Sequence, residues 1–202
     1  YGDWSSDVCS SDLRRVAVIH NGIDVAAFRF YERGAGLAFL GRIESGKGPD
    51  LAVQVARQLD LPLTLAGPIV DNELFEKTIR PHLGEQIRYI GVVNHEQKNK
   101  LLGEAAVALL PFRGAEGFGL VSIEAMASGT PVVALANGAL PEVVEPGVTG
   151  YLTHSESELA ALTRMAMKLE RERIRERVAS RFDMSVVAES YRKLYRQIVV
   201  EA

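Results

Sequence analysis

Short apolar runs alternate with segments of helical periodicity from residue 37 onward, and this alternation restricts the fold more than any other feature. The run 37–41 (LAFLG) is apolar up to its glycine, as expected of a strand buried on both faces. The pattern predicts strands over 37–41, 62–67, 87–93, 107–111, 131–136 and 149–152. It predicts helices over 49–59, 71–83, 94–105, 120–128, 140–144, 155–168, 170–181 and 185–199.

Strands that alternate with helices pair in parallel, because a parallel strand is reached only through a crossover connection. We therefore predict an α/β fold, a doubly wound parallel sheet with helices on both faces (Rossmann-like). Such sheets bind ligands at the carboxyl ends of their strands, near the point where the strand order reverses. The loops in which to look for chemistry are those after Gly41, Gly67, Gly91, Pro111 and Ala136.

Composition and charge exclude several classes of protein. The 202 residues are 47% hydrophobic and 24% charged, which is the balance of a folded globular chain. No apolar run approaches the roughly 18 residues of a membrane span, so we expect no stable membrane insertion. The net charge of −3 argues against a nucleic-acid partner. A single cysteine favours a reducing, cytoplasmic setting.

One charged segment, 170–181, is rich in arginine. Its acidic residues are interleaved with the basic ones, and it has no aromatic residue on which a base could stack. We interpret it as a solvated helix face with pairs such as Glu172 and Arg175, rather than as a surface for nucleic acid or membrane.

The first residues, 1–13, differ from the rest of the chain. They hold the only tryptophan and the only cysteine, with an imperfect SSD repeat and no amphipathic period. Cys9 could be a redox or metal-binding thiol. We favour a non-native or disordered tail, and we exclude it from the fold prediction.

The loop after the first predicted strand, G41-R-I-E-S-G-K47-G48, nearly matches a phosphate-binding P-loop. A P-loop places Ser or Thr after its lysine to hold Mg²⁺, and Gly48 has no side chain for this purpose. The loop still offers Arg42 and Lys47 beside glycines that allow close approach to a ligand, so the two cations could neutralise a diphosphate. The alternative is a pair of exposed charges in a turn.

A second candidate lies after the fourth predicted strand, where Glu116 precedes the glycine-rich start of a helix. The first amides of that helix, near 119–121, lack internal partners and can bind an anion. Glu124 lies about one turn inside the helix, where a carboxylate can accept hydrogen bonds from the vicinal hydroxyls of a ribose. Glu116 can accept hydrogen bonds from sugar hydroxyls. The alternative for both residues is simple exposure to solvent.

Four motifs in this order carry a resemblance. They are G41-R42 with K47-G48, E116-x7-E124, EAMASGTPVVA from Glu124, and P141-E142-V143-V144 followed by G147-V148-T149-G150-Y151-L152. Over residues 16–202 the chain resembles the family 4 glycosyltransferases of the GT-B fold, and within them the carboxyl-terminal, donor-binding half. H20-N21-G22-I23-D24 is similar to the linker between the two halves, with His20 in place of proline. The resemblance thus implies an interdomain linker over 14–36 and a nucleotide-sugar-binding domain with its terminal helices over 37–202.

The resemblance also implies roles for individual residues. Arg42 and Lys47 would bind the donor diphosphate and stabilise the departing nucleoside diphosphate, while Glu116 would hold the transferred sugar, and these three are the candidate catalytic residues. Gly117 departs from the proline often found there, and Ala139 from the second of two glycines. The candidate donor-binding residues, which would meet base, ribose, phosphate or sugar, are Gly41, Gly67, Gly91, Val92, Gly117, Phe118, Gly119, Leu120, Val121 and Glu124.

The expected chemistry needs no metal ion or other cofactor. The chain has no Asp-x-Asp motif, and cations with a helix start can stabilise a leaving diphosphate in place of a metal. By resemblance the transfer retains the anomeric configuration, from a UDP- or GDP-linked donor to an acceptor that the sequence does not identify. We expect a partner amino-terminal GT-B domain to hold that acceptor, and the 202-residue piece to be inactive alone. The alternatives are a non-catalytic nucleotide-sugar-binding module and a GT-B sugar-nucleotide epimerase.

Overall fold

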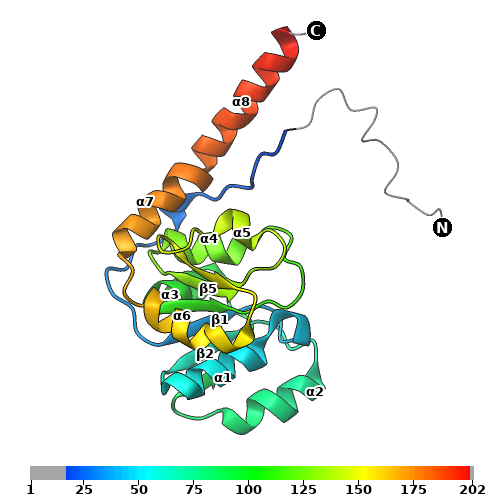
Figure 1. Cartoon of the computed structure of the whole chain (residues 1–202), viewed down its shortest axis with the longest axis vertical. Coiled ribbons are helices and arrows are strands. Elements are labelled where there is room, and N and C mark those ends of the chain that lie inside the picture. The colour runs from blue at the N-terminus through cyan, green and yellow to red at the C-terminus, as the bar shows by residue number, and fades with distance from the viewer. Residues whose placement is uncertain (1–16, 201–202) are drawn as a thin grey trace, which may run out of the picture.

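A six-stranded parallel sheet forms the centre of the computed structural model, which describes residues 17–200 (Figure 1). The strand order is β3-β2-β1-β4-β5-β6. The strands are β1 (Leu37–Leu40), β2 (Leu63–Ala66), β3 (Ile87–Tyr89), β4 (Val107–Leu110), β5 (Val132–Leu135) and β6 (Gly150–Thr153). Every pairing is parallel, as the alternation of the sequence predicts. The predicted tail 1–13 and the first linker residues, 14–16, lie outside the described residues.

Helices cover both faces of the sheet because the chain winds outward in two directions. It runs from β1 to β3 on one side of β1, then returns to β4 and runs to β6 on the other side. Right-handed crossovers therefore place the helices after β1 and β2 on one face and those after β3 and β4 on the other. The α-helices are α1 (Pro49–Leu59), α2 (Asn72–Leu74), α3 (His95–Glu104), α4 (Leu120–Ala127), α5 (Leu140–Val143), α6 (Leu159–Ala166), α7 (Arg171–Phe182) and α8 (Met184–Val200).

The local signals predicted most element ends. Pro49 begins α1 at its first turn, and Asn94 caps α3 by accepting a hydrogen bond from the Gln97 amide at 2.9 Å. β3 is shorter than the predicted 87–93, because the chain turns at Gly91 (φ 76°). The predicted helix 71–83 is irregular: α2 passes into a π-helical turn, Phe75–Ile79, and a 3-10 turn, Arg80–His82. Pro81 has no N–H with which to continue an α-helix.

The interpretation of 170–181 as a solvated face is wrong for three of its arginines, Arg171, Arg175 and Arg181, which are partly buried and donate to backbone carbonyls. Arg175 of α7 donates to the carbonyl oxygen of Ala127, the last residue of α4. Arg171 donates to the Gly103 carbonyl, at the end of α3, at 2.7 Å. Its burial lowers its pKa to about 10. The carboxyl ends of helices leave carbonyls without partners, and these cations donate hydrogen bonds to them. A positive charge at this end also interacts favourably with the helix dipole. No ion pair joins Glu172 to Arg175 among the residues that the structure describes.

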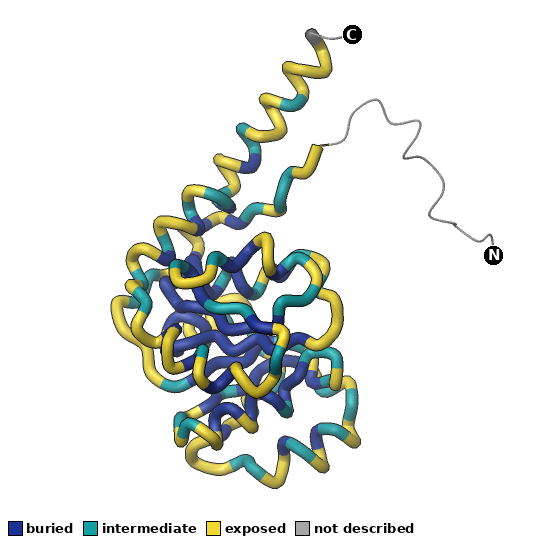
Figure 2. The backbone as a smooth tube through the Cα atoms, viewed as in Figure 1, coloured by how far each residue is buried: buried dark blue, intermediate teal, exposed yellow. Residues whose placement is uncertain are grey.

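Helix α8 extends away from the sheet, beside the first described residues (Figure 1). Burial is concentrated in the sheet and the helices against it, and most of α8 is exposed (Figure 2). Backbone hydrogen bonds hold Ile23 at the junction of α7 and α8: it donates to Phe182 and accepts from Met184, both at 2.9 Å. No helix within residues 17–200 has the length and apolarity to cross a membrane.

Candidate functional site

The two loops singled out by the sequence meet where the strand order reverses. β1 lies between β2 and β4, so the loops after β1 and β4 leave the sheet side by side. The Gly114 amide of the second loop donates to the Gly46 carbonyl of the first at 2.9 Å. This is the position at which doubly wound sheets bind their ligands.

Gly48 explains why the first loop is not a P-loop. Its backbone is left-handed, with φ 65°, and a Cβ atom placed on it would lie 2.2 Å from the Pro111 carbonyl oxygen. A serine or threonine there would force the two loops apart. The glycine that removes the Mg²⁺-binding hydroxyl is therefore the residue that lets the loops pack.

Lys47 and Glu116 form an ion pair between the two loops. Lys47 ends the 3-10 turn Ser45–Lys47, and its Nζ lies 2.5 Å from Glu116 Oε2. The ammonium also lies 4.4 Å from the centroid of the Phe112 ring. The side chains are 22% and 19% exposed, so water screens the pair only in part. The loop carrying Glu116 is supported from behind, where the Ala139 amide donates to its carbonyl at 2.9 Å.

A cavity of about 220 Å³ opens beside this ion pair. Its floor includes the start of α4, which Gly119 precedes in a left-handed conformation (φ 84°) that allows the chain to turn into the helix. No side chain caps α4, so its first amides remain available to an anion. The cavity is lined by Asn21, Leu40, Gly41, Lys47, Phe112, Glu116, Phe118, Gly119, Leu120 and Val121.

Other candidate residues lie outside this cavity. Arg42 is 58% exposed and pairs with Glu44 at 2.8 Å, so it does not share the environment of Lys47. Gly117 is exposed in the loop beside Glu116, and Val92, after β3, is 72% exposed.

Gly41, Gly67 and Gly91 lie in a row at the carboxyl edge of β1, β2 and β3. Gly41 donates to Ala66 at 3.0 Å, and Gly67 donates to Gly91 at 2.8 Å. A Cβ atom on Gly67 would lie 2.0 Å from the Gly41 carbonyl oxygen, so the close approach requires glycine. Tyr89 donates from its hydroxyl to the Gly67 carbonyl at 2.7 Å, and burial raises its pKa, which keeps it a donor.

Glu124 lies about one turn inside α4, as predicted, and forms an ion pair with Lys98 of α3. Lys98 Nζ is 2.5 Å from Glu124 Oε1, and the side chains are 22% and 13% exposed. The alternative considered for Glu124, simple exposure to solvent, is wrong, because its side chain is 13% exposed and Lys98 contacts its carboxylate.

Sequence reasoning missed Lys98, Asn21 and Phe112. Lys98 is one of several polar residues on α3, and only the packing of α3 on α4 places it opposite Glu124. Asn21 belongs to the motif matched to a linker, yet it lines the cavity. The preceding His20 contacts Glu142 at 2.8 Å, and its ring centroid lies 5.9 Å from that of Phe118. Only the fold brings the linker motif next to the site.

No group of three or more His, Cys, Asp or Glu side chains placed to hold a metal ion occurs among residues 17–200. The polar residues that line the cavity are one lysine, one glutamate and one asparagine, beside the helix amides. This set can bind an anion at the amides and ammonium, and hydroxyls at the carboxylate.

Comparisons with known proteins identify the family of the chain. Residues 24–181 match the family described as "Glycosyl transferases group 1". A D-inositol 3-phosphate glycosyltransferase of Mycolicibacterium gilvum is 32% identical over 164 residues, covering 72% of this chain and 37% of the relative. A glycogen synthase of Mycobacterium tuberculosis is 32% identical over 212 residues, covering 96% and 51%.

Among solved structures, AviGT4, a glycosyltransferase involved in avilamycin A biosynthesis, matches with a TM-score of 0.81 and 27% identity over 94% of this chain and 60% of that one. HepE of Anabaena, solved in complex with UDP-glucose, shares the fold with a TM-score of 0.74 and 20% identity, over 90% and 57%. The chain thus spans between 37% and 51% of the length of the two curated relatives above. The predicted Rossmann-like sheet of a GT-B fold is confirmed. By its sequence profile and its relatives, the chain belongs to the group 1 glycosyl transferases.

Proposed function

We propose that this chain binds the nucleotide-sugar donor of a retaining, metal-independent hexosyltransferase. The observation that carries the proposal is the Lys47–Glu116 pair, which faces a cavity at the uncapped start of α4. A nucleotide sugar presents a diphosphate and a hydroxyl-rich ring, which are the two chemical classes that these groups can bind.

The proposed roles follow from where charge develops during transfer. The bond between the sugar C1 and the phosphate oxygen breaks, and its electron pair remains on that oxygen. An ammonium and helix amides aimed at the diphosphate stabilise this charge more than they stabilise the bound donor. Lys47 and the amides of 120–121 lie at the cavity for this task, with Glu116 placed to accept hydrogen bonds from the sugar.

The diphosphate would compete with Glu116 for Lys47. The pair lies between two loops, so Lys47 can turn toward a phosphate without breaking a helix or a strand. Glu116 is then released to the sugar hydroxyls. One ion pair thereby supplies both a cation for the phosphate and an acceptor for the sugar.

UDP is the first nucleotide to test, with GDP as its rival. HepE has been solved with UDP and with UDP-glucose, and it shares its fold with this chain. The acceptor, which we assign to an amino-terminal GT-B domain outside this chain, is not specified by any residue described above.

The test is calorimetric titration of the 202-residue chain with UDP, GDP, ADP and UDP-glucose, with and without EDTA. We expect UDP or GDP to bind with an affinity that EDTA leaves unchanged. Failure of every nucleoside diphosphate to bind would refute the donor site, and loss of binding in EDTA would refute metal independence. Retention is then read from the anomeric configuration of the product formed by a longer protein that includes the acceptor domain.

A further inference from the structure

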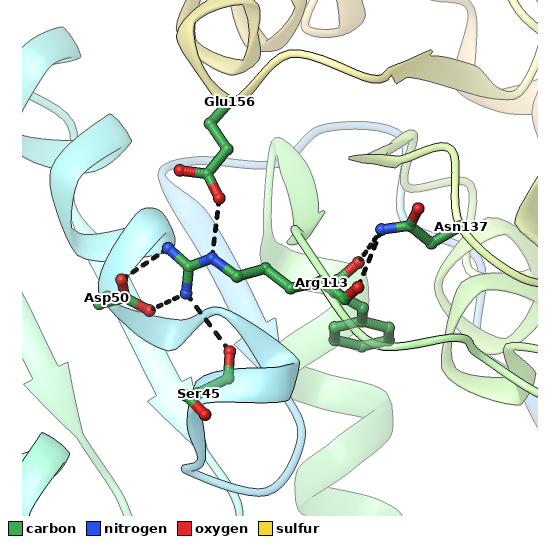
Figure 3. Close-up of polar contacts among 6 residues, drawn as sticks. Ser45, Asp50, Arg113, Asn137 and Glu156 are labelled. Atoms are coloured by element: carbon green, nitrogen blue, oxygen red, sulfur yellow. Dashed lines mark hydrogen bonds and ion pairs between the residues drawn. The ribbon is translucent and has the colours of Figure 1, made fainter.

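Arg113 joins three elements around the loop that carries Lys47 (Figure 3). It lies in the loop after β4, and its two terminal nitrogens donate to the two carboxylate oxygens of Asp50 in α1, each at 2.8 Å. Nη1 also donates to the Ser45 carbonyl at 3.3 Å, and Nε donates to Glu156 at 2.7 Å. The guanidinium therefore contacts both ends of the segment 45–50, in which Lys47 lies.

The backbone of Arg113 is held in place as well. Asn137, after β5, donates from its side-chain amide to the carbonyls of Phe112 at 2.9 Å and Arg113 at 3.2 Å (Figure 3). The next amide, of Gly114, donates to Gly46 at 2.9 Å. The guanidinium of Arg113 and the backbone that follows it thus bind the same turn.

The bond to Asp50 is the strongest part of this arrangement. A bidentate arginine–carboxylate pair fixes orientation as well as distance. Asp50 is 15% exposed and Glu156 is 50% exposed, so solvent weakens the second partner more. The hydrogen bond to Asp50 is the main reason that the pKa of Arg113 is raised.

We propose that Arg113 is a positioning residue for Lys47: it fixes the turn 45–47 so that the Lys47 ammonium is held at the donor diphosphate. The inference rests on the proposed function. Arg113 does not line the cavity and contacts no group assigned to the donor. It acts through the turn, which is otherwise tied to the loop after β4 by the backbone hydrogen bond from Gly114 to Gly46 and by the Lys47–Glu116 ion pair that the diphosphate would break.

The two carboxylates on Arg113 provide a matched pair of variants. Asp50→Asn removes the charge that anchors the guanidinium on the Lys47 segment. Glu156→Gln removes a charge on the same guanidinium but on the far side, in the 3-10 turn after β6. If Arg113 positions Lys47, Asp50→Asn should weaken UDP binding to the chain about tenfold, because a small displacement of a binding group lowers affinity. Glu156→Gln should change UDP binding by less than about twofold.

A double-mutant cycle identifies the route of the effect. Arg113→Met should weaken UDP binding about tenfold in the natural chain and have no further effect in Lys47→Met, because the group it positions is gone. Arg113→Lys keeps the charge without the bidentate geometry, so its affinity for UDP should lie between those of the natural chain and of Arg113→Met. Circular dichroism and thermal unfolding establish which variants are folded. If Arg113→Met is not folded, the inference is tested by comparing Asp50→Asn with Glu156→Gln.

Equal losses in Asp50→Asn and Glu156→Gln, or a loss from Arg113→Met that persists in full beside Lys47→Met, would overturn the inference. If Lys47→Met weakens UDP binding and the Arg113 and Asp50 variants do not, the inference fails while the proposed function stands. If the natural chain binds no nucleoside diphosphate, the proposed function fails with it.

Discussion

Two lysine–glutamate pairs in this molecule are almost identical as local geometry. Lys47 with Glu116 and Lys98 with Glu124 each have a nitrogen–oxygen distance of 2.5 Å, and each lysine is 22% exposed. Each ammonium also lies near an aromatic ring, at 4.4 Å from the centroid of Phe112 for Lys47 and 5.8 Å from that of Phe28 for Lys98.

The pairs differ in the elements that carry them. Lys47 and Glu116 lie in loops and line a cavity, whereas Lys98 and Glu124 lie within helices α3 and α4. A side chain in a loop can move away from its partner at little cost in stability. Separating a pair between packed helices costs more, because the pair is part of their packing. Distance and exposure are therefore alike in the two pairs, and the supporting elements are the basis on which we expect the loop pair to bind the donor and the helix pair to stabilise the packing.

Replacing Lys47 by methionine should produce the largest loss of UDP affinity. It is the most direct test of whether the two ion pairs differ in function. Among the described residues that line the cavity, the change removes the only ammonium, and it keeps most of the length of the side chain. We expect UDP binding to weaken by about 1.5–3 kcal/mol, the scale of a hydrogen bond to a charged group. Calorimetric titration measures the affinity.

The matched control for Lys47→Met is Lys98→Met, which removes an ammonium of equal exposure from the other pair. Both variants are titrated with inorganic diphosphate, and we expect Lys47→Met to weaken its binding and Lys98→Met to leave it unchanged. Equal losses in the two variants would show that overall charge, and not the position of Lys47, governs binding.

Lys98→Met should instead lower stability, which is the second prediction. It leaves the Glu124 carboxylate 13% exposed and without its cation, at a cost of about 1–3 kcal/mol. For a chain of this size the midpoint of thermal unfolding should fall by about 2–4 °C per kcal/mol. An unchanged midpoint would mean that solvent satisfies Glu124 and that the pair contributes nothing to the packing of α3 on α4.

Glu124→Gln sharpens the comparison by asking whether the helix pair also takes part in binding. If Glu124 accepts hydrogen bonds from the ribose, the natural chain binds UDP more tightly than 2′-deoxy-UDP, by about 1 kcal/mol. The glutamine variant should lose most of this discrimination. If the ratio of the affinities for UDP and 2′-deoxy-UDP is the same in the natural chain and in the variant, Glu124 does not bind the ribose and its role is structural.

How far the sequence predicts this molecule depends on the range of the interaction. The parallel sheet follows from apolar runs and crossovers, and Asn94 follows from cap chemistry within one turn. The edge glycines and the loop with Lys47 were predicted because they end strands, which fixes their place in any doubly wound sheet. These are properties that neighbouring residues determine.

Partners between distant segments were not predictable in the same way. The contacts of Lys98 with Glu124 and of Arg175 with Ala127 depend on how particular helices pack, which no local pattern encodes. Charge patterning therefore misassigned Arg175 to a solvated face. The pairing of Lys47 with Glu116 lies between these cases, because topology brings the loops together but not the two side chains.

Asp183 lies outside both lysine–glutamate pairs. Its replacement should have the smallest effect, a change in how stability depends on pH. It accepts hydrogen bonds from the hydroxyl and amide of Ser185, at 2.5 and 3.0 Å, and from the Val25 amide at 3.3 Å. These bonds, the Ser185 hydroxyl foremost, lower its pKa below the ordinary value of 3.8. The folded state then binds fewer protons than the unfolded state, so the contribution is complete above about pH 4 and is lost as the pH falls through the lowered pKa.

Asp183→Asn keeps an acceptor at the start of α8 but removes the titration. Chemical unfolding of the two chains should give equal stability within about 0.5 kcal/mol at pH 7, because the cap remains. Below about pH 4 the natural chain should lose stability more steeply than the variant. Parallel curves through that range would show that water already satisfies the carboxylate. The junction of 23–25 with α8 would then rest on its backbone hydrogen bonds.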